Sequence, residues 1–520
     1  MAKLGIIETL VFVVGFSIML IEIGGARLIS PYMGNTIFAW TSIISVVLAA
    51  LGVGYWVGGV LADKRHDFRF LCWLSLAGGA YTIAIPAFSM LALGPISFIG
   101  VEFGPMVASL LLFALPNILL GMVVPFSVKL RTKRMMVGRS VGNLYAIEVA
   151  GSITGTLLTG FILIPYVGIA QSFAGIGILL IIMGAVFYRS ARYAALALAA
   201  IALPLLITLV ASLIPNNIAS PTAMLTGNVV YRVDSAYYQI EVINQSGLLL
   251  LRTDLTPQTV LMPQETNTLF EAYGQYQKLI YYNRPYVQNA LYLGLGGGAM
   301  VDNLYQNTNA DITIVEIDPA VIKVAMQFFN LSKGPRVNVI NEDGRFFLRS
   351  STETYNMIVL DVYGSSALIP PEFTTLQAAQ EIKSHLSADG SVLINMPPPI
   401  YGNNSCAFRS FYKTYASVFQ NMYIFPMEPS QLNQEQSVIQ NIVVIASDRQ
   451  YPINSTVNSM LSFANADQIG WVANGNYNKQ INTTGCPILT DNNNPYELYS
   501  AGVLKMYYCS GARLSNQQCR

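Results

Sequence analysis

A glycine-rich loop after an apolar run is the first feature of this sequence that could support chemistry. Residues 290–298 read Ala-Leu-Tyr-Leu-Gly-Leu-Gly-Gly-Gly. Glycines let the chain turn sharply after a strand and let the backbone approach a ligand closely. Glu316 lies 22 residues after Gly294, at the end of the next apolar run, where an acidic side chain can bind both hydroxyls of a ribose. The spacing predicts a nucleoside site.

Two later aspartates extend this pattern. Asp343 follows a third apolar run and precedes a glycine, and Asp361 ends a fourth run. The order of glycine loop, ribose-binding acid and later aspartate favours an adenosyl cofactor over a dinucleotide.

These residues need a framework that brings the ends of several strands together. Apolar runs alternate with helix-like segments, which predicts an α/β Rossmann-like, doubly wound parallel sheet. The predicted strands are 290–293, 312–318, 337–340, 357–361 and 391–395, and helices up to 307 and over 319–329, 344–350 and 373–387 separate or flank them. A β-hairpin, 237–242 with 248–252 around a turn at 244–247, and a helix over about 266–282 are expected before the sheet.

The composition divides the chain into two parts that suit different solvents. Of 520 residues, 53% are hydrophobic and only 11% are charged, against about 25% charged in a typical soluble protein. Residues 1–214 carry 12 basic and 6 acidic side chains, whereas 215–520 carry 17 and 22. A polar disordered chain and a single ordinary cytosolic domain are excluded. The net negative second part argues against a nucleic-acid partner.

The first part repeats apolar stretches of about 20 residues, each long enough to cross roughly 30 Å of hydrocarbon. They predict an α-helical bundle of about seven spans, so the lipid bilayer is an expected partner. The first stretch is too long, and too soon followed by others, for a cleaved signal peptide. The expected spans are 5–25, 38–60, 70–92, 104–125, 142–164, 168–187 and 194–214.

Lysine and arginine in the short loops predict the orientation of this bundle, because such loops tend to stay cytoplasmic. Eleven of these residues fall at the N-terminus and after the second, fourth and sixth spans, whereas the opposite loops hold only Arg27. The N-terminus of this multi-pass protein is therefore expected in the cytoplasm. An odd number of spans then places residues 215–520 outside the cell membrane.

Small and acidic residues stand out within the spans. Gly54 with Gly58 and Gly151 with Gly155 form GxxxG pairs, which allow helices to approach closely. Glu148 is a carboxylate at membrane depth, where a charge is costly and usually has a partner or a task. The sequence suggests no partner for it, so structural pairing and a polar cavity or transport role both stay open.

The motifs of the second part resemble spermidine synthase, the polyamine aminopropyltransferase fold. The matching motifs are Leu293–Gly298, Val315–Val321, Glu342–Arg345 and Ile358–Asp361. The first part is similar to membrane-embedded, fused spermidine synthase-like proteins, at Pro31–Gly34, Trp40–Ser42, Gly54–Asp63 and Gly142–Ala146. The resemblance implies that the β-hairpin forms a small subdomain over the active site.

The resemblance also implies a cofactor, either decarboxylated S-adenosylmethionine or S-adenosylmethionine. It implies that Gly294, Gly296 and Gly298 line this cofactor, that Glu316 binds its ribose and that Asp343 binds its adenine amine. By the same resemblance, Asp361 would orient and deprotonate a small amine acceptor.

Several positions that would hold a diamine depart from the family. The second aspartate expected three residues after Asp361 is Gly364, and the loop continues with Ala299 instead of aspartate. The hairpin glutamine falls at Tyr238, although Gln239 is adjacent, and the Tyr-His-Glu motif falls near 274–276 without its histidine. A dicationic amine would lose its counter-charges here. The resemblance therefore favours an adenosyl pocket and disfavours a putrescine site.

Cysteines and sequons bear on the compartment. The polar part holds Cys406, Cys486, Cys509 and Cys519, without the CxxC spacing typical of a metal site. Two disulfides, 406 with 486 and 509 with 519, are expected from three connectivities, and four free thiols are the cytosolic alternative. Asn-x-Ser/Thr sequons begin at residues 244, 330, 403, 454 and 482 and predict glycosylation only weakly. No metal site is expected.

The predicted organisation has four parts and leaves three functions open. The parts are a membrane domain, 1–214, a hairpin subdomain with its helix, 215–285, the Rossmann-like core, 286–400, and an Asn/Gln/Tyr-rich extension, 401–520. The first function is a membrane-anchored transferase of spermidine synthase type. The second is a non-catalytic exported protein that retains the fold for binding or structure. The third is a polyamine-related transporter or sensor. Homo-oligomerisation is left open.

Overall fold

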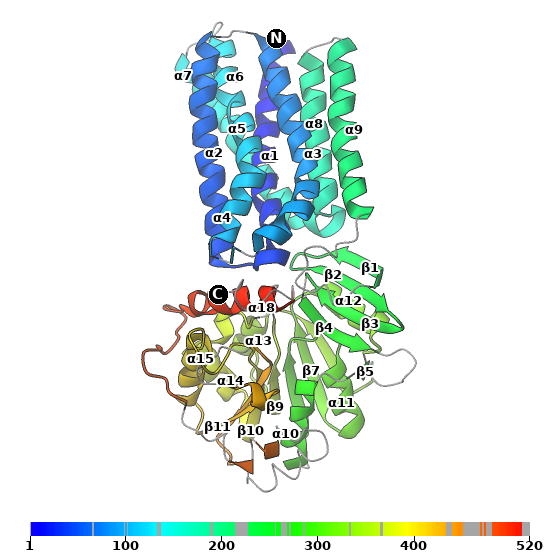
Figure 1. Cartoon of the computed structure of the whole chain (residues 1–520), viewed down its shortest axis with the longest axis vertical. Helices are drawn as coiled ribbons and strands as arrows, with labels where there is room; N and C mark the ends of the chain where they lie inside the picture. Colours follow the sequence, from blue (N-terminus) through cyan, green and yellow to red (C-terminus); the bar gives the residue numbers. More distant parts are fainter. Residues whose placement is uncertain are drawn as a thin grey trace. The chain divides into compact units, whose positions relative to one another are not determined.

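A computed structural model shows an α-helical part and an α/β part (Figure 1). It describes residues 2–64, 67–97, 99–100, 102–132, 137–187, 191–213, 227–254, 256–261, 268–269, 272–283, 287–331, 334–363, 368–432, 439–450, 469–470, 473–474 and 481–511. Two compact units emerge from the contacts. The first is Met1–Ala223 with Asp234–Tyr237, and the second is Met224–Val233 with Tyr238–Arg520.

The helical unit contains five helices that are long and apolar enough to cross a membrane. They cover Gly5–Met33, Ile37–Lys64, Phe68–Ser97, Gly104–Arg131 and Val137–Val167. Two further helices, α8 (Ile169–Phe187) and α9 (Ala191–Leu213), follow them. Their described apolar stretches are shorter, Ile169–Ala185 and Tyr193–Pro204. Helices thus occupy all seven expected stretches, while the number that cross a membrane stays a prediction.

Two of these spans are not regular α-helices. The fourth consists of α4 (Gly104–Ser109), a π-helix (Leu110–Ala114), α5 (Leu115–Gly121) and α6 (Val123–Thr132). The fifth is α7 (Val137–Leu158), which continues as a π-helix to Val167 around Pro165. Proline lacks the N–H that an α-helix needs, which explains the second irregularity.

The GxxxG pairs lie where helix backbones touch, as the spacing predicts. A Cβ on Gly151 would lie 2.1 Å from the carbonyl oxygen of Phe12, in α1 (Ala2–Met33). One on Gly54, in α2 (Ile37–Lys64), would lie 2.6 Å from the carbonyl oxygen of Ile118. Neither site has room for a side chain, so glycine sets the distance between these helices.

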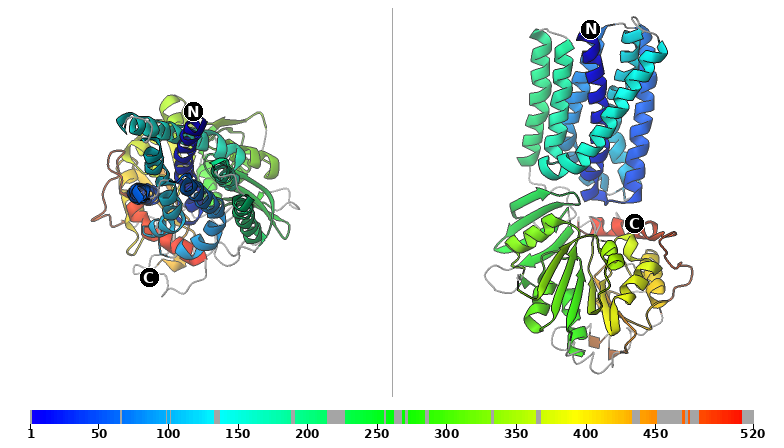
Figure 2. Two further views of the ribbon diagram at one scale, coloured as in Figure 1. Left: turned by 90° about the horizontal axis from the view of Figure 1, so that it is seen from above. Right: turned by 180° about the vertical axis from the view of Figure 1, so that it is seen from behind.

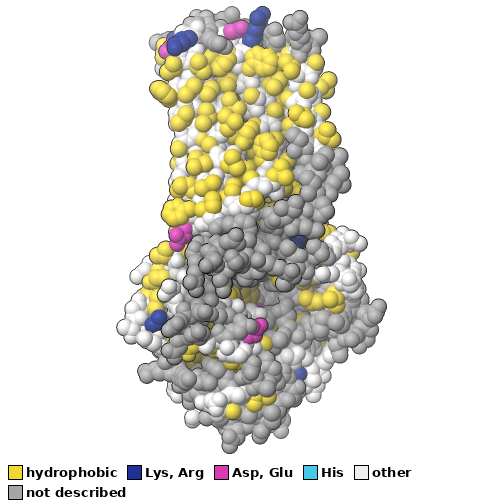
Figure 3. Space-filling model, viewed as in Figure 1, with side chains coloured by type: hydrophobic (Ala, Val, Ile, Leu, Met, Phe, Trp, Pro, Cys, Tyr) yellow, Lys and Arg dark blue, Asp and Glu magenta, His cyan; other side chains and the backbone are white. Residues whose placement is uncertain are grey.

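Charged residues of this unit pair at one end of the helices. Lys129 Nζ lies 2.6 Å from Asp63 Oδ1, and Arg131 Nη1 lies 2.8 Å from Glu8 Oε1. The N-terminus and the ends of the second and fourth spans therefore share one end, as the alternation of basic loops requires. Hydrophobic side chains cover the length of the helices in the view of Figure 3.

Glu148 has a partner that the sequence did not reveal. Its Oε1 accepts a hydrogen bond of 2.8 Å from the hydroxyl of Tyr55, which comes from α2. Glu148 is buried on the face of α7 that also carries Gly151 and Gly155. Structural pairing between helices therefore accounts for one oxygen of this carboxylate.

The α/β unit is built on a seven-stranded sheet with the order β11-β12-β10-β9-β6-β7-β8. Five strands are parallel and follow the Rossmann order 3-2-1-4-5 from β8 to β10. The strands are β6 (Asn289–Leu293), β7 (Asp311–Glu316), β8 (Val337–Asn341), β9 (Tyr355–Leu360), β10 (Leu386–Asn395), β11 (Asn421–Pro426) and β12 (Ile442–Ser447). This confirms the predicted alternation.

Helices cover both faces of the sheet, which explains why its central strands are apolar without alternation (Figure 2). One face packs against α13 (Gly344–Ser350), α14 (Leu376–Ser384) and α15 (Cys406–Ala416). The other packs against α10 (Gln277–Asn283), α11 (Ala299–Asn307) and α12 (Pro319–Phe328). Asp318 caps α12 by accepting from Ala320 N, and Pro319 occupies its first turn.

The core does not end near residue 400, where the sequence suggested a boundary. Strands β11 and β12 lie in the extension, and β12 pairs antiparallel with both β10 and β11. The run Ile442–Ala446 is continuously apolar, which is typical of a buried strand. The helix expected over 266–282 is also wrong, since α10 begins only at Gln277, after a 3-10 turn over Ala272–Tyr276 and the short strand β5 (Thr268–Leu269).

A second, five-stranded antiparallel sheet precedes the large one. Its strands are β1 (Asn228–Asp234), β2 (Gln239–Gln245), β3 (Leu248–Thr253), β4 (Thr256–Leu261) and β5. The predicted hairpin strands are β2 and β3, and they pair in register around Ser246-Gly247. Apolar side chains of β2, β3 and β4 pack against Val321 and Val324 of α12, which ties this sheet to the large one.

Candidate functional site

The carboxyl ends of the parallel strands meet at one edge of the large sheet. The glycine loop follows β6, Glu316 ends β7, Asp343 follows β8 and Asp361 follows β9. In open α/β sheets, ligands bind at this edge. The fold therefore brings the cofactor residues and Asp361, predicted from separate motifs, to the same place.

The glycine loop begins with a close approach of two backbones. Gly294 has φ +91°, and its N–H donates to the carbonyl oxygen of Val315 at 2.9 Å. A Cβ at this position would lie 2.4 Å from the carbonyl oxygen of Asp361. Gly296 and Gly298 also have positive φ, +55° and +85°, so the loop needs glycine for its conformation.

Glu316 is fixed from both sides by backbone amides. Its Oε2 accepts from Leu295 N at 3.0 Å, and its Oε1 accepts from Asp318 N at 2.9 Å. Each carboxylate oxygen has a second lone pair, so the group can still accept from two hydroxyls. Glu316 is only 8% exposed, and this burial disfavours its charged form. The backbone amides stabilise the charged form but offset only part of this effect, so the pKa of Glu316 is raised to about 7.

Asp343 has a structural task as well as its predicted one. It is the N-cap of α13, and its Oδ1 accepts from Phe346 N at 2.8 Å. An aspartate directly before a helix is a common cap, so the sequence did carry this signal. The next residue but one, Arg345, is buried and forms ion pairs with Glu381 and Asp491.

Asp361 lies beside an amide that the sequence analysis missed. The Nδ2 of Asn395 is 3.4 Å from Asp361 Oδ1, and Asn395 ends β10, the next strand of the sheet. Asn395 is only 2% exposed, and its Oδ1 accepts no hydrogen bond from the residues described. The sequence could have indicated Asn395, because this residue ends the predicted strand 391–395.

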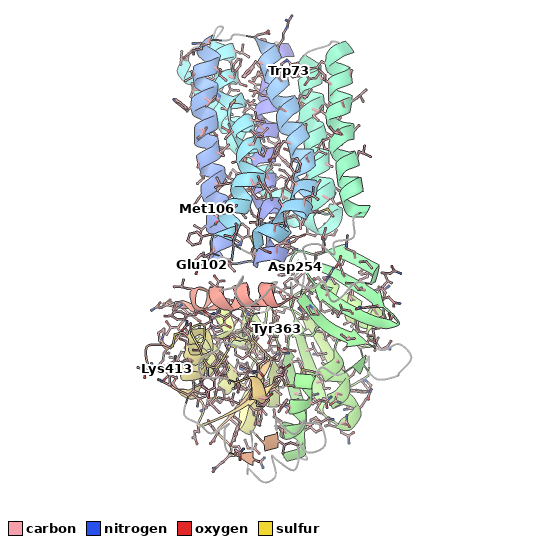
Figure 4. The ribbon with its side chains drawn as sticks, viewed as in Figure 1. Trp73, Glu102, Met106, Asp254, Tyr363 and Lys413 are labelled. Carbon is pink, nitrogen blue, oxygen red and sulfur yellow. A yellow bond between two sulfur atoms is a disulfide. The ribbon has the colours of Figure 1, made fainter. Side chains whose placement is uncertain are left out.

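Tyr238 contacts the segment that directly follows Asp361. The Tyr238 hydroxyl is 3.3 Å from the carbonyl oxygen of Tyr363, and the Tyr363 hydroxyl donates to the carbonyl oxygen of Asn395 at 2.8 Å. Gln239 bonds through its backbone to Asp254, with N to Oδ1 2.9 Å. Figure 4 marks Tyr363 and Asp254. Tyr238 therefore lies next to the segment after Asp361, and the role of Tyr238 or Gln239 toward an acceptor stays a prediction.

A further missed contact joins the two sheets at the glycine loop. Gly297 N donates to Thr259 Oγ1 at 2.9 Å, and Thr259 belongs to β4. A Cβ on Gly297 would lie 2.7 Å from Thr259 Cγ2. The smaller sheet therefore supports the loop directly, beyond the β2–β3 hairpin that the sequence predicted.

The cysteines give one confirmed pair. Cys406 and Cys486 form a disulfide with a Cα–Cα distance of 5.7 Å. The predicted 509–519 pair lies outside the described side chains, and so does Gly364. Among the described residues, no group of three or more His, Cys, Asp or Glu could hold a metal ion.

Comparison with known proteins finds a family model that matches this part of the chain. Residues 280–433 match the model of the spermine/spermidine synthase domain. The match runs past residue 400 and so includes the start of the predicted extension. Polyamine aminopropyltransferase 1 of Streptomyces coelicolor is 21% identical over 408 residues, which cover 73% of each chain.

Two other similarities are partial. An N-terminal histidine N-methyltransferase of Emericella nidulans is 35% identical over 143 residues, 26% of this chain and 23% of the relative. A probable spermidine synthase from Corynebacterium glutamicum is 17% identical over 51% of this chain and 96% of its own, with a TM-score of 0.41. The chain spans less than half the length of several other curated aminopropyltransferases that it matches.

Proposed function

We propose that the protein is a membrane-anchored transferase that uses decarboxylated S-adenosylmethionine or S-adenosylmethionine, because residues 280–433 match the model of the spermine/spermidine synthase domain. The observation that carries this proposal is the position of Glu316. It is buried, held by two backbone amides and located next to the glycine loop. A buried carboxylate with spare acceptor capacity at this edge suits the two hydroxyls of a ribose.

The residues present fit an adenosyl cofactor. Gly294, Gly296 and Gly298 would leave the backbone open toward it, Glu316 would hold its ribose and Asp343 its adenine amine. When bound, such a cofactor supplies a carbon made electrophilic by the adjacent sulfonium. Asp361 would orient the acceptor amine and accept the proton that this amine releases.

The acceptor side favours an amine other than putrescine. The neutral amide of Asn395 lies beside Asp361 there, and the hydroxyl of Tyr238 reaches the backbone of Tyr363, two residues further on. Gly364 replaces the second aspartate of the family, so a dication would lack one of its counter-charges. We expect the protein to bind methylthioadenosine or an S-adenosyl compound and to form little spermidine from putrescine.

The second candidate is a non-catalytic exported protein that retains the nucleoside site or only the fold. The same loss of an acceptor carboxylate favours it, and so does the disulfide between Cys406 and Cys486, which suits an oxidising compartment. In both candidates the apolar helices, five of which are long enough to cross a membrane, would anchor the chain. The bias of Lys and Arg toward one set of loops would place the N-terminus inside and, with an odd number of spans, the α/β unit outside.

Calorimetry and product analysis on the full-length protein test the function. Methylthioadenosine and S-adenosyl compounds are titrated first, and products are then identified with putrescine, longer polyamines and no acceptor. Nucleoside binding with transfer to an amine other than putrescine supports the transferase. Efficient spermidine formation would show that Asp361 alone serves a diamine, and no nucleoside binding would leave only the fold.

A separate experiment tests the location. Protease or an impermeant cysteine reagent applied to intact cells should reach the α/β unit if it lies outside. Protection until the membrane is broken would overturn this orientation and favour a cytosolic transferase.

A further inference from the structure

The segment 481–494, which we call the clamp segment, is held to the core by many specific contacts. It carries Cys486, whose disulfide to Cys406 closes a separation of 80 residues. Lys413 of α15, which Figure 4 labels, donates from Nζ to the carbonyl oxygen of Cys486 at 2.9 Å. Leu489 is fully buried, and its N–H donates to Thr414 Oγ1 at 2.9 Å. The clamp segment therefore has a defined position on α15.

The same segment reaches the start of α14. Leu376 N donates to the carbonyl oxygen of Leu489 at 2.8 Å, and Asp491 N donates to Gln377 Oε1 at 3.0 Å. Asn494 Nδ2 donates to the carbonyl oxygen of Pro371 at 2.7 Å. These contacts fix the backbone on both sides of Asp491.

Asp491 extends from this position to α13, the helix that begins at Asp343. Its Oδ1 accepts from Thr375 Oγ1 at 2.6 Å, and its Oδ2 lies 3.2 Å from Arg345 Nη2 and 3.4 Å from Arg349 Nη2. Burial alone would raise the pKa of Asp491, but Thr375 and the arginines outweigh it and hold this pKa below the usual 3.8. Asp491 is therefore ionised at neutral pH.

Arg345 links Asp491 to the helix that carries Asp343 at its N-terminus. It is the buried second residue of α13 and bonds Glu381 through Nε at 2.7 Å and Nη2 at 3.1 Å. With Asp491 it forms an ion-pair cluster that fixes α13 against α14. Asp343, whose carboxylate caps the first turn of α13, takes its position from the same helix.

We propose that the disulfide-bonded clamp segment positions α13 for nucleoside binding, with Asp491 as the positioning residue. The proposal rests on the proposed function, since it assigns Asp343 to the nucleoside. Asp491 lies 148 positions after Asp343 and does not itself contact the ligand; it acts through Arg345. Loss of its charge should loosen the first turn of α13 and weaken nucleoside affinity while the sheet stays folded.

Asp491→Asn in the full-length protein is the direct test, with methylthioadenosine as the probe. We expect its dissociation constant to rise about tenfold, the lower end of the cost of losing a hydrogen bond to a charged group, because Asp491 acts through Arg345. Asp448→Asn is the matched control, because Asp448 pairs with Lys383 at 2.7 Å and is as exposed as Asp491, 31% against 34%. This control should leave affinity within about twofold.

Two further measurements separate positioning from general stability. Amide hydrogen exchange over 343–350 should speed up in Asp491→Asn while β9 and β10 stay protected, and Asp491→Glu should restore part of the affinity. Reduction of the disulfide in folded wild-type protein should weaken binding in the same direction. An unchanged dissociation constant in both Asp491→Asn and the reduced protein overturns the clamp. A wild-type protein that binds no nucleoside overturns the proposed function instead.

Discussion

The candidate site has a cofactor half, formed by the glycine loop, Glu316 and Asp343, and an acceptor half, formed by Asp361, Asn395 and Tyr238. The two halves rely on different kinds of atoms. Backbone atoms do most of the work in the cofactor half: Gly294 turns there, and the amides of Leu295 and Asp318 hold Glu316. In the acceptor half, the side chains of Asp361 and Asn395 meet, and the hydroxyl of Tyr238 bonds the backbone of Tyr363, two residues after Asp361. Backbone geometry is retained as long as the fold is retained, whereas a single substitution can change a side-chain contact. The cofactor half can therefore persist while the acceptor specificity changes.

The sharpest test of the cofactor half is Glu316→Ala. Two hydrogen bonds from ribose hydroxyls to a carboxylate are lost, each worth about 1.5–3 kcal/mol, so nucleoside affinity should fall by roughly 100-fold or more. Calorimetry with methylthioadenosine measures this loss. Glu353→Ala, at an exposed position outside the site, is the control and should bind like wild type. Equal affinity in both variants would place the nucleoside elsewhere.

The acceptor half can be tested by restoring the acid that the family carries. Gly364→Asp adds a carboxylate three residues after Asp361, and we expect diamine-dependent product to rise about 10- to 100-fold, as for one charge-assisted contact. Nucleoside affinity should not change. Ser365→Asp adds the same charge at the next position and controls for bulk electrostatics. A gain that is equal in the two variants would argue against a defined diamine position.

The sequence predicted the residues of the cofactor half more completely than those of the acceptor half. The glycine loop, Glu316 and Asp343 follow consecutive strands, and parallel strands end at one edge, so spacing alone predicted their convergence. Asn395 was missed because its role depends on the neighbour of its strand in the sheet. The contact of Asp491 with Arg345 spans 146 residues, and no local pattern predicts such a pair.

The fold shows the same division between local and distant information. Apolar runs such as 312–315 and 357–360 identified the parallel strands, and the GxxxG spacing identified helix contacts that the structure confirms. Strands β11 and β12 were missed although Ile442–Ala446 is an apolar run, since the surrounding Asn and Gln suggested an irregular tail. Tyr55, the partner of Glu148, lies on another helix, so no local sequence pattern predicted this contact either.

The titration of Glu316 determines how nucleoside affinity depends on pH. Its pKa, about 7, means that the charged form, which accepts from ribose, appears as pH rises through 7. Affinity for methylthioadenosine should therefore increase about tenfold from pH 6 to pH 8, because the charged fraction grows by that factor. Titrations at several pH values measure it, and Glu316→Gln should remove the dependence.

Stability of the ligand-free protein should change in the opposite direction. The pKa of Glu316 is raised above its usual 4.5, so its contribution to stability is fully present below pH 4.5 and is lost as pH rises through about 7. Unfolding of wild type against Glu316→Gln isolates this contribution. Affinity and stability that rise together with pH would contradict the assignment of Glu316 as the ribose acceptor.

The smallest expected effect concerns Tyr238 in the acceptor half. Tyr238→Phe removes the hydroxyl that lies 3.3 Å from the carbonyl oxygen of Tyr363, a neutral contact worth about 0.5–1.5 kcal/mol. The apparent affinity for the amine acceptor should fall about threefold, while nucleoside affinity stays the same, because the cofactor half does not use this side chain. Steady-state kinetics with the best acceptor and calorimetry with methylthioadenosine separate the two. Tyr237→Phe, the exposed neighbouring tyrosine, serves as the matched control. A change in nucleoside affinity alone would move Tyr238 to the cofactor half and would remove the distinction between the two halves at this residue.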